Sequence, residues 1–236
     1  MKKYLFFGDS FTYGQDAEDD KSTWPYHYLT MIEKQDTNYA IKAKPGQSNS
    51  GIFLDILESY QKKEIDRDSI VFVGLTNIYR DCTTVATHGF HKFLGNQYHS
   101  VNAHTESKDK VLNTYRDSFI LEKDWILYTK ALQYIFAIEN LLNKVGCKFY
   151  LIDIILSYDR FRDALDIDWN LCKNFITSPY DNKWNTVPPL SIYHYMLEEL
   201  NIPLSPSKHF YSEGYYAMAK VVKDQIDKYE KNINRI

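Results

Sequence analysis

Four short runs of apolar residues stand out in the pattern of hydrophobic and polar positions along the chain. They cover residues 3–8, 38–43, 69–75 and 148–155. The third and fourth runs, SIVFVGL and KFYLIDII, are nearly continuous and rich in β-forming residues. Such runs are typical of strands that are buried on both faces of a parallel sheet. The pattern therefore predicts a mainly parallel sheet built from these segments.

Segments with helical periodicity lie between and after the predicted strands. They cover about 24–34, 50–63 and 114–145, and a last one runs from about Ser212 to the C-terminus. In the second segment, Ile52, Ile56 and Tyr60 recur at helical spacing. The alternation of strands and helices predicts an α/β fold, a three-layer α/β/α sandwich.

Two polar stretches interrupt this alternation, at about 76–113 and 157–190. Each follows a predicted strand, and loops at the carboxyl ends of parallel strands surround the active crevice of open α/β sheets. We expect these irregular insertions to select the substrate. The chain shows no internal repeat and no flexible linker, so we predict a single domain over 1–236.

The composition narrows the classes of partner. The chain has 236 residues, of which 44% are hydrophobic, and a net charge of −3. It lacks the basic excess of nucleic-acid-binding proteins, and no apolar run approaches the length of a membrane span. The apolar run near the N-terminus is shorter than the apolar core of a signal peptide. The three cysteines are far apart in the sequence, so no disulfide scaffold is implied. We therefore expect a cytoplasmic protein without nucleic-acid or membrane partners.

The sequence FFGDSFTYG, residues 6–14, carries the first candidate for catalysis. Ser10 follows a predicted strand at the point where the chain should turn into a helix. Its hydroxyl would lie at the carboxyl edge of the sheet, close to backbone N–H groups that can stabilise an oxyanion. Asp9 is expected to organise this turn. A serine is a weak nucleophile on its own and needs a base.

His209 is the candidate base. It lies in a polar turn of the sequence SPSKHFYSEGYYAMA, directly before the last predicted helix. An isolated histidine is usually a surface residue, but a histidine at this junction, combined with an N-terminal Gly-Asp-Ser, is a specific long-range pattern. The two residues together predict a serine nucleophile activated by an imidazole.

In block order, these motifs resemble those of the SGNH, or GDSL-type, hydrolases over nearly the whole chain. FFGDSFTYG resembles the first block of that family, and KPGQSNSGI (44–52), VFVGLTNIYR (71–80) and HFYSEGYYAMA (209–219) resemble the later ones. The resemblance implies a flavodoxin-like sheet, Ser10 as nucleophile and His209 as general base. It also implies hydrolysis of an ester through an acyl-serine intermediate, without a cofactor.

The resemblance also implies an oxyanion hole, made of the Ser10 N–H, a glycine and an asparagine. The glycine falls on Gly46, or on Asn49 in a different register. The family pattern Gly-x-Asn places Thr76 at the third position, whereas Asn77 comes one residue late and is the chemically better donor. We favour Gly46 and Asn77, with Asn49 and Thr76 as alternatives.

One position departs from the family pattern. An aspartate is usual three residues before the histidine, where it orients the imidazole, but this chain has Pro206 there. A backbone carbonyl could orient His209, or an acid from elsewhere, with Asp166, Asp168 and Glu213 as candidates. The third alternative is an impaired site, because loss of the orienting acid lowers the rate by orders of magnitude.

Two further features carry weaker predictions. Arg80 is a candidate for binding a polar or carboxylate group of the substrate, with a surface ion pair as the alternative. The histidines of HGFH (88–91) lack accompanying cysteine or acidic ligands, so we expect a solvated loop and no metal site. No phosphate-loop or dinucleotide fingerprint is present, and we expect no cofactor.

The prediction for function is a serine esterase, an acyl- or acetylesterase that acts on a small-molecule or carbohydrate ester. The alternative is a binding or structural module that keeps the fold and has lost the chemistry. An intact hydrogen bond between Ser10 and His209 would favour the enzyme, and a filled crevice would favour the module.

Overall fold

A five-stranded parallel sheet forms the centre of the computed structural model, which describes residues 2–34, 36–78, 80–83, 99–102, 124–155, 174–179 and 191–233. The strands are β1 (Lys3–Gly8), β2 (Tyr39–Ala43), β3 (Ser69–Leu75), β6 (Lys148–Asp153) and β7 (Phe175–Ile176). Their spatial order is β2-β1-β3-β6-β7, and every neighbouring pair is parallel. This order is that of a flavodoxin-like sheet, as predicted.

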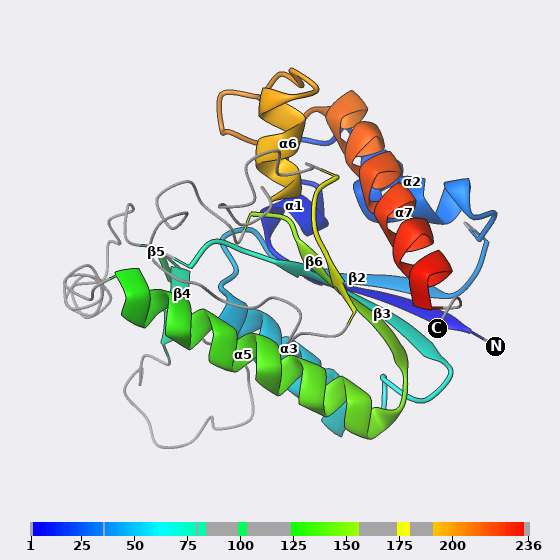
Figure 1. Cartoon of the computed structure of the whole chain (residues 1–236), viewed down its shortest axis with the longest axis vertical. Helices are drawn as coiled ribbons and strands as arrows, with labels where there is room; N and C mark the ends of the chain where they lie inside the picture. The colour runs from blue at the N-terminus through cyan, green and yellow to red at the C-terminus, as the bar shows by residue number, and fades with distance from the viewer. Residues whose placement is uncertain are drawn as a thin grey trace.

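Helices cover both faces of this sheet (Figure 1). They are α1 (Ser10–Tyr13), α2 (Trp24–Met31), α3 (Asn49–Gln61), α5 (Asp124–Val145), α6 (Ile192–Glu198) and α7 (Ser212–Ile233), with a 3₁₀ turn at Asp20–Ser22. Helices α3 and α5 lie on one face, whereas α2 and α7 lie on the other. The three-layer α/β/α sandwich is therefore confirmed. None of the helices in these described ranges is long and apolar enough to cross a membrane.

The alternation of side chains along β1 explains the two layers of core. Leu5 and Phe7 pack into the cluster that includes α3 and α5. Tyr4 and Phe6 point to the opposite face and join the cluster that includes α2 and α7. Both sets are apolar because a central parallel strand is buried on both faces, which is why the sequence shows a continuous run and no alternation.

The two stretches expected to be irregular contain short strands. An antiparallel pair, β4 (Arg80–Thr83) with β5 (His99–Asn102), lies within the first stretch. Strand β7 lies within the second stretch and completes the edge of the main sheet. Short strands therefore occur within both of the stretches that the sequence marked as irregular insertions. The other residues of both stretches lie largely outside the described ranges.

Close packing beneath α1 fixes the position of Ser10. A side chain at Gly8 would place its Cβ 2.2 Å from Oγ1 of Thr12, and one at Gly74 would place it 2.4 Å from the same atom. Both glycines therefore leave room for the first helical turn to lie directly against β1 and β3. Gly14 ends that turn in the left-handed region, with φ of 83°, which a glycine adopts without strain.

Candidate active site

The turn after β1 places Ser10 at the carboxyl edge of the sheet. Asp9 caps α1, because its Oδ1 accepts a hydrogen bond of 3.0 Å from the N–H of Phe11. Ser10 is the first residue of the helix, where backbone N–H groups have no partner within the helix. The expectation that Asp9 organises the turn is confirmed, and the Ser10 hydroxyl lies at the N-terminus of this short helix.

A tight loop before α7 presents His209. The N–H of Ser205 donates to the carbonyl of His209 at 2.8 Å, and the N–H of Lys208 donates to the carbonyl of Ser205 at 3.0 Å. Lys208 adopts a left-handed conformation, with φ of 69°. Phe210 is fully buried and anchors the end of the loop. These contacts fix the imidazole at the same edge of the sheet as Ser10.

The two predicted catalytic residues are in contact. Nε2 of His209 lies 2.8 Å from Oγ of Ser10, and the ring of Phe11 packs 4.9 Å from the imidazole between ring centroids. Ser10 is only 1% exposed, and the His209 side chain is 12% exposed. This burial lowers the pKa of His209, although the carboxylates of Asp9 and Asp16 act in the opposite direction. A neutral imidazole is the form that can accept a proton.

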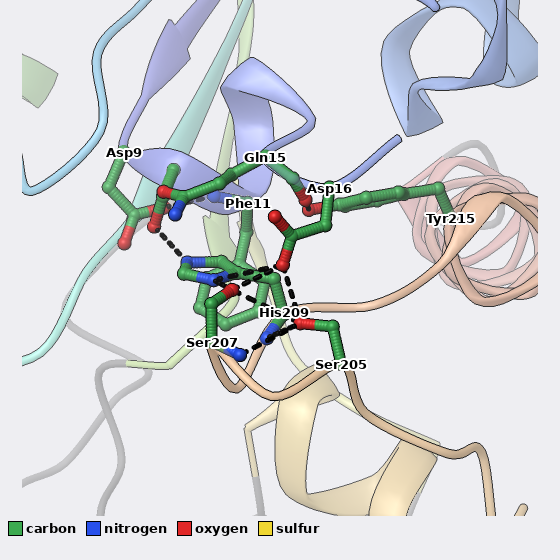
Figure 2. A network of polar contacts seen from close by, with 9 residues as sticks. Asp9, Phe11, Gln15, Asp16, Ser205, Ser207, His209 and Tyr215 are labelled. Carbon is green, nitrogen blue, oxygen red and sulfur yellow. Dashed lines mark hydrogen bonds and ion pairs between the residues drawn. The ribbon is translucent and has the colours of Figure 1, made fainter. Parts of the chain in front are cut away.

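The group on the other side of the imidazole was missed by the sequence analysis (Figure 2). Nδ1 of His209 lies 2.8 Å from Oγ of Ser207, which in turn donates to Oδ2 of Asp16. The direct distance between Nδ1 and that carboxylate oxygen is 3.9 Å. The Ser205 hydroxyl also donates to Oδ2 of Asp16. Hydrogen bonds from the two hydroxyls lower the pKa of Asp16.

Among the described residues, the acid near His209 is Asp16, which the sequence did not suggest. Glu213 is exposed in the first turn of α7 and has no recorded contact with His209 within the described part of the chain. Asp166 and Asp168 lie outside the described residues. No local spacing indicates Asp16, since it is 191 residues away from Ser207 in the chain. The one local feature of the sequence that bears on this contact is the pair of serines on either side of Pro206, both of which bond to Asp16.

The loop that carries Asp16 is held by the start of α7. The hydroxyl of Tyr215 donates to the carbonyl of Gln15 at 2.7 Å, and the N–H of Glu18 donates to Oγ of Ser212 at 3.2 Å. Asp16 itself is left-handed, with φ of 68°, a conformation that aspartate tolerates better than most residues. The final helix thus positions both the loop of Asp16 and the loop of His209.

The residues predicted for the oxyanion hole follow β2 and β3, at the same carboxyl edge of the sheet as Ser10. Two of them, Asn49 and Thr76, form hydrogen bonds that fix their positions. Asn49 pairs with the backbone of Thr76, donating to its carbonyl at 2.8 Å and accepting from its N–H at 3.0 Å. The Thr76 hydroxyl donates its hydrogen to Asp9 at 2.7 Å. Gly46 adopts φ of 76° in the turn before α3, and Asn77 is half-buried after β3. Gly46 and Asn77, with Asn49 and Thr76 as alternatives, stay a proposal for the oxyanion hole.

Arg80 forms a sheltered ion pair beneath the site. Its Nη1 lies 2.8 Å from Oδ2 of Asp9, with side chains that are 16% and 0% exposed, and donates to Oγ1 of Thr76 at 3.1 Å. The alternative of a surface ion pair is therefore wrong, because Asp9 is fully buried. Arg80 also borders a shallow hollow with little enclosed space, whose other lining residues come from the start of α3, the segment after β3 and the first half of α5. A contact of Arg80 with substrate stays a prediction.

Metal ligands do not gather in the part of the chain that is described. No group of three or more histidine, cysteine, aspartate or glutamate side chains there is arranged to hold an ion. The HGFH sequence at 88–91 lies outside that part. The chemistry available at the site is that of a hydroxyl, an imidazole, a carboxylate and backbone N–H groups.

Comparison with known proteins gives structural neighbours only. No family model matches the sequence, and no curated protein matches it. Esterase EstA from Pseudoalteromonas sp. aligns with a TM-score of 0.54 and 11% identity, over 97% of this chain and 98% of that one. TesA aligns with a TM-score of 0.54 and 10% identity, over 96% of this chain and 99% of that one. The lipase Lip_vut3 from a goat rumen metagenome aligns with a TM-score of 0.53 and 12% identity, over 95% of this chain and 97% of that one.

These likenesses extend over nearly the full length of each chain and show the fold. The chain therefore shares the fold of these neighbours, and its three-layer α/β/α sandwich around a parallel sheet is the architecture that the sequence predicted. Two of these neighbours are named as an esterase and a lipase.

Proposed function

We propose that the protein is a serine hydrolase that cleaves an acyl or acetyl ester through an acyl-serine intermediate. The observation that carries the proposal is the 2.8 Å contact between Oγ of Ser10 and Nε2 of His209. A serine and an imidazole at hydrogen-bond distance, beside the N-terminus of a helix, form the machinery of nucleophilic acyl transfer.

The reaction follows from this geometry. Oγ of Ser10 attacks the ester carbonyl carbon while its proton passes to Nε2 of His209, and the carbonyl oxygen becomes an oxyanion near the N–H of Ser10. The tetrahedral intermediate then collapses, and the protonated His209 gives its proton to the leaving alkoxide. Water, deprotonated by His209, attacks the acyl-serine in the same way and releases the acid. We assign Gly46 and Asn77 as the further oxyanion donors.

The substrate class we propose is a small-molecule or carbohydrate ester. Two tyrosines near the pair in sequence are exposed, Tyr13 at 52% and Tyr211 at 44%. Aromatic rings with a polar tip suit a ligand that offers both apolar faces and hydroxyl groups. They support a carbohydrate ester as the substrate.

The binding-module alternative keeps one supporting observation, which is the low exposure of Ser10, 1%. A substrate must reach that hydroxyl for the chemistry to occur. The intact Ser10–His209 contact favours the enzyme, because a module without chemistry does not need this pairing.

Hydrolysis of a short-chain aryl ester tests the proposal. Ser10→Ala should lower kcat/KM by at least about 1000-fold, because the nucleophile is lost. Ser22→Ala is the matched control, since that serine lies in the same N-terminal region and donates its hydroxyl hydrogen to Asp19 in an exposed hydrogen bond. Full activity of the Ser10→Ala protein would sink the proposal.

A further inference from the structure

The proposed mechanism leaves open which group holds the imidazole in its productive form. Ser10 occupies Nε2 of His209, so the orienting group must meet Nδ1. Ser207 is the partner recorded at hydrogen-bond distance from Nδ1 among the described residues. A hydroxyl alone does not fix the tautomer, because it can either donate to a ring nitrogen or accept from it.

Asp16 determines the direction of the Ser207 hydrogen. A carboxylate only accepts hydrogen bonds, so the Ser207 hydroxyl must donate to Oδ2 of Asp16. A hydroxyl has one hydrogen, and Ser207 then meets Nδ1 with a lone pair. Nδ1 must therefore carry the ring hydrogen, which leaves the lone pair of Nε2 for the proton of Ser10.

We propose that Asp16 is the orienting acid of this site and that it acts on His209 through the hydroxyl of Ser207. This inference rests on the proposed function of the Ser10–His209 pair. Asp16 and Ser207 are positioning residues, because neither touches the reacting atoms.

The surroundings of Asp16 support this role. The two hydroxyl donors, Ser205 and Ser207, stabilise its ionised form. Ser205 also accepts hydrogen bonds from the N–H groups of Ser207 and His209, at 3.2 and 3.3 Å. The carboxylate therefore organises the whole loop before α7 as well as the ring it contains (Figure 2).

The charged groups around His209 act together on the imidazolium that forms during catalysis. Asp16 faces it from the loop after α1, and Asp9 lies in the turn after β1. Arg80, at the start of β4, is positively charged and opposes the stabilising effect of both carboxylates on the imidazolium. The Asp16 side chain is 31% exposed and 3.9 Å from Nδ1. Solvent therefore weakens its charge effect, and fixing the tautomer is its larger contribution.

Substitutions at both positions test the chain of contacts. Asp16→Asn should lower kcat on an aryl ester by about 10- to 100-fold, less than the roughly 10⁴-fold loss when an acid in direct contact is changed. Its amide can donate to Ser207, turn that hydroxyl toward Nδ1 and favour the wrong tautomer. Ser207→Ala should give a similar loss, and Ser207→Thr, which keeps the hydroxyl, should restore most of the activity.

A matched control and a readout without turnover complete the experiment. Asp19→Asn removes an exposed acid from the same loop and should leave kcat unchanged. In ¹⁵N NMR of the ring, identified by its loss in His209→Gln, the wild type should carry hydrogen on Nδ1. Asp16→Asn and Ser207→Ala should reduce that form.

The outcomes separate this inference from the proposed function. Unchanged kcat and an unchanged ring spectrum in both variants would overturn the role of Asp16 while leaving the hydrolase proposal intact. A wild type without esterase activity would contradict the hydrolase proposal, and the ring spectra would still test the Asp16 contact. A Nε2–H tautomer in the wild type would overturn the inference directly.

Discussion

At the scale of single residues, the site depends on polar side chains that form hydrogen bonds with one another. Ser10 and His209 are 199 residues apart in the chain and meet at 2.8 Å. The sequence predicted this pair because each residue belongs to a local motif at a characteristic place in the chain. Asp16 could not be found in the same way, because the intervening Ser207 separates the acid from the histidine and removes the expected spacing.

Asp9 shows how a nearby charge is kept from competing with the chemistry. Its Oδ1 caps α1, and its Oδ2 accepts from Thr76 and Arg80. A fully buried carboxylate needs such partners. The role in the turn could be predicted from the Gly-Asp-Ser motif, but the ion pair with Arg80 could not, because it depends on the path of the chain after β3.

The titration of His209 gives a prediction at this scale. Burial lowers the pKa of His209 below its ordinary value of about 6.5. Only the neutral ring accepts the proton of Ser10, so kcat/KM should fall as the pH drops through that lowered pKa and stay level above it. A pH profile of kcat/KM measures the midpoint. A midpoint at or above the ordinary value would contradict the account.

The same profile in the Asp16→Asn variant sharpens the test. The carboxylate of Asp16 supports the charged ring, so its removal should move the midpoint to still lower pH. A variant that merely loosened the loop would lose activity without this shift.

At the scale of elements, the strands and long helices could be predicted and the short elements could not. β1 and β3 occupy the residues that the apolar runs predicted, whereas α3 begins at Asn49, one residue earlier than predicted. β7 has two residues, Phe175 and Ile176, and its place in the sheet comes from pairing with β6. A run that short carries no periodicity, so only the tertiary contact defines it.

The packing of α1 against the sheet gives a prediction at this scale. Gly8→Ala would bring a Cβ to 2.2 Å from Oγ1 and 2.6 Å from Cβ of Thr12. The turn must then shift, at a cost of about 1–3 kcal/mol in the free energy of unfolding. Because α1 carries Ser10, we also expect lower kcat per folded molecule, measured together with denaturant unfolding.

Gly146→Ala is the control for this prediction. Gly146 is left-handed, with φ of 75°, and follows α5, and the nearest atom to a new Cβ there is 3.9 Å away. The change should cost stability through backbone strain alone and leave kcat unaltered. Equal losses of kcat in both variants would show that stability, and not the position of α1, decides activity.

At the scale of the whole molecule, the fold brings the two ends of the chain together at one edge of the sheet. Ser10 begins α1 directly after β1, Asp16 lies in the loop after α1, and the segment before α7 supplies Ser207 and His209. Figure 2 shows Asp16 beside Ser207 and His209. The order of the strands places β1 between β2 and β3, in the interior of the sheet, so the turn that follows it lies away from the two ends of that edge. The motifs at the two ends of the sequence predicted this meeting, whereas the serine-mediated contact became visible only in the structure.

The most direct test of the central claim is the reaction of Ser10 with a fluorophosphonate, followed by mass spectrometry of the peptides. The account predicts one adduct on Ser10, its absence in Ser10→Ala, slower labelling in His209→Gln, and unchanged labelling in Ser22→Ala. Failure of the folded wild type to form an adduct on Ser10 would contradict the claim that His209 activates this hydroxyl as a nucleophile, and would favour the binding module.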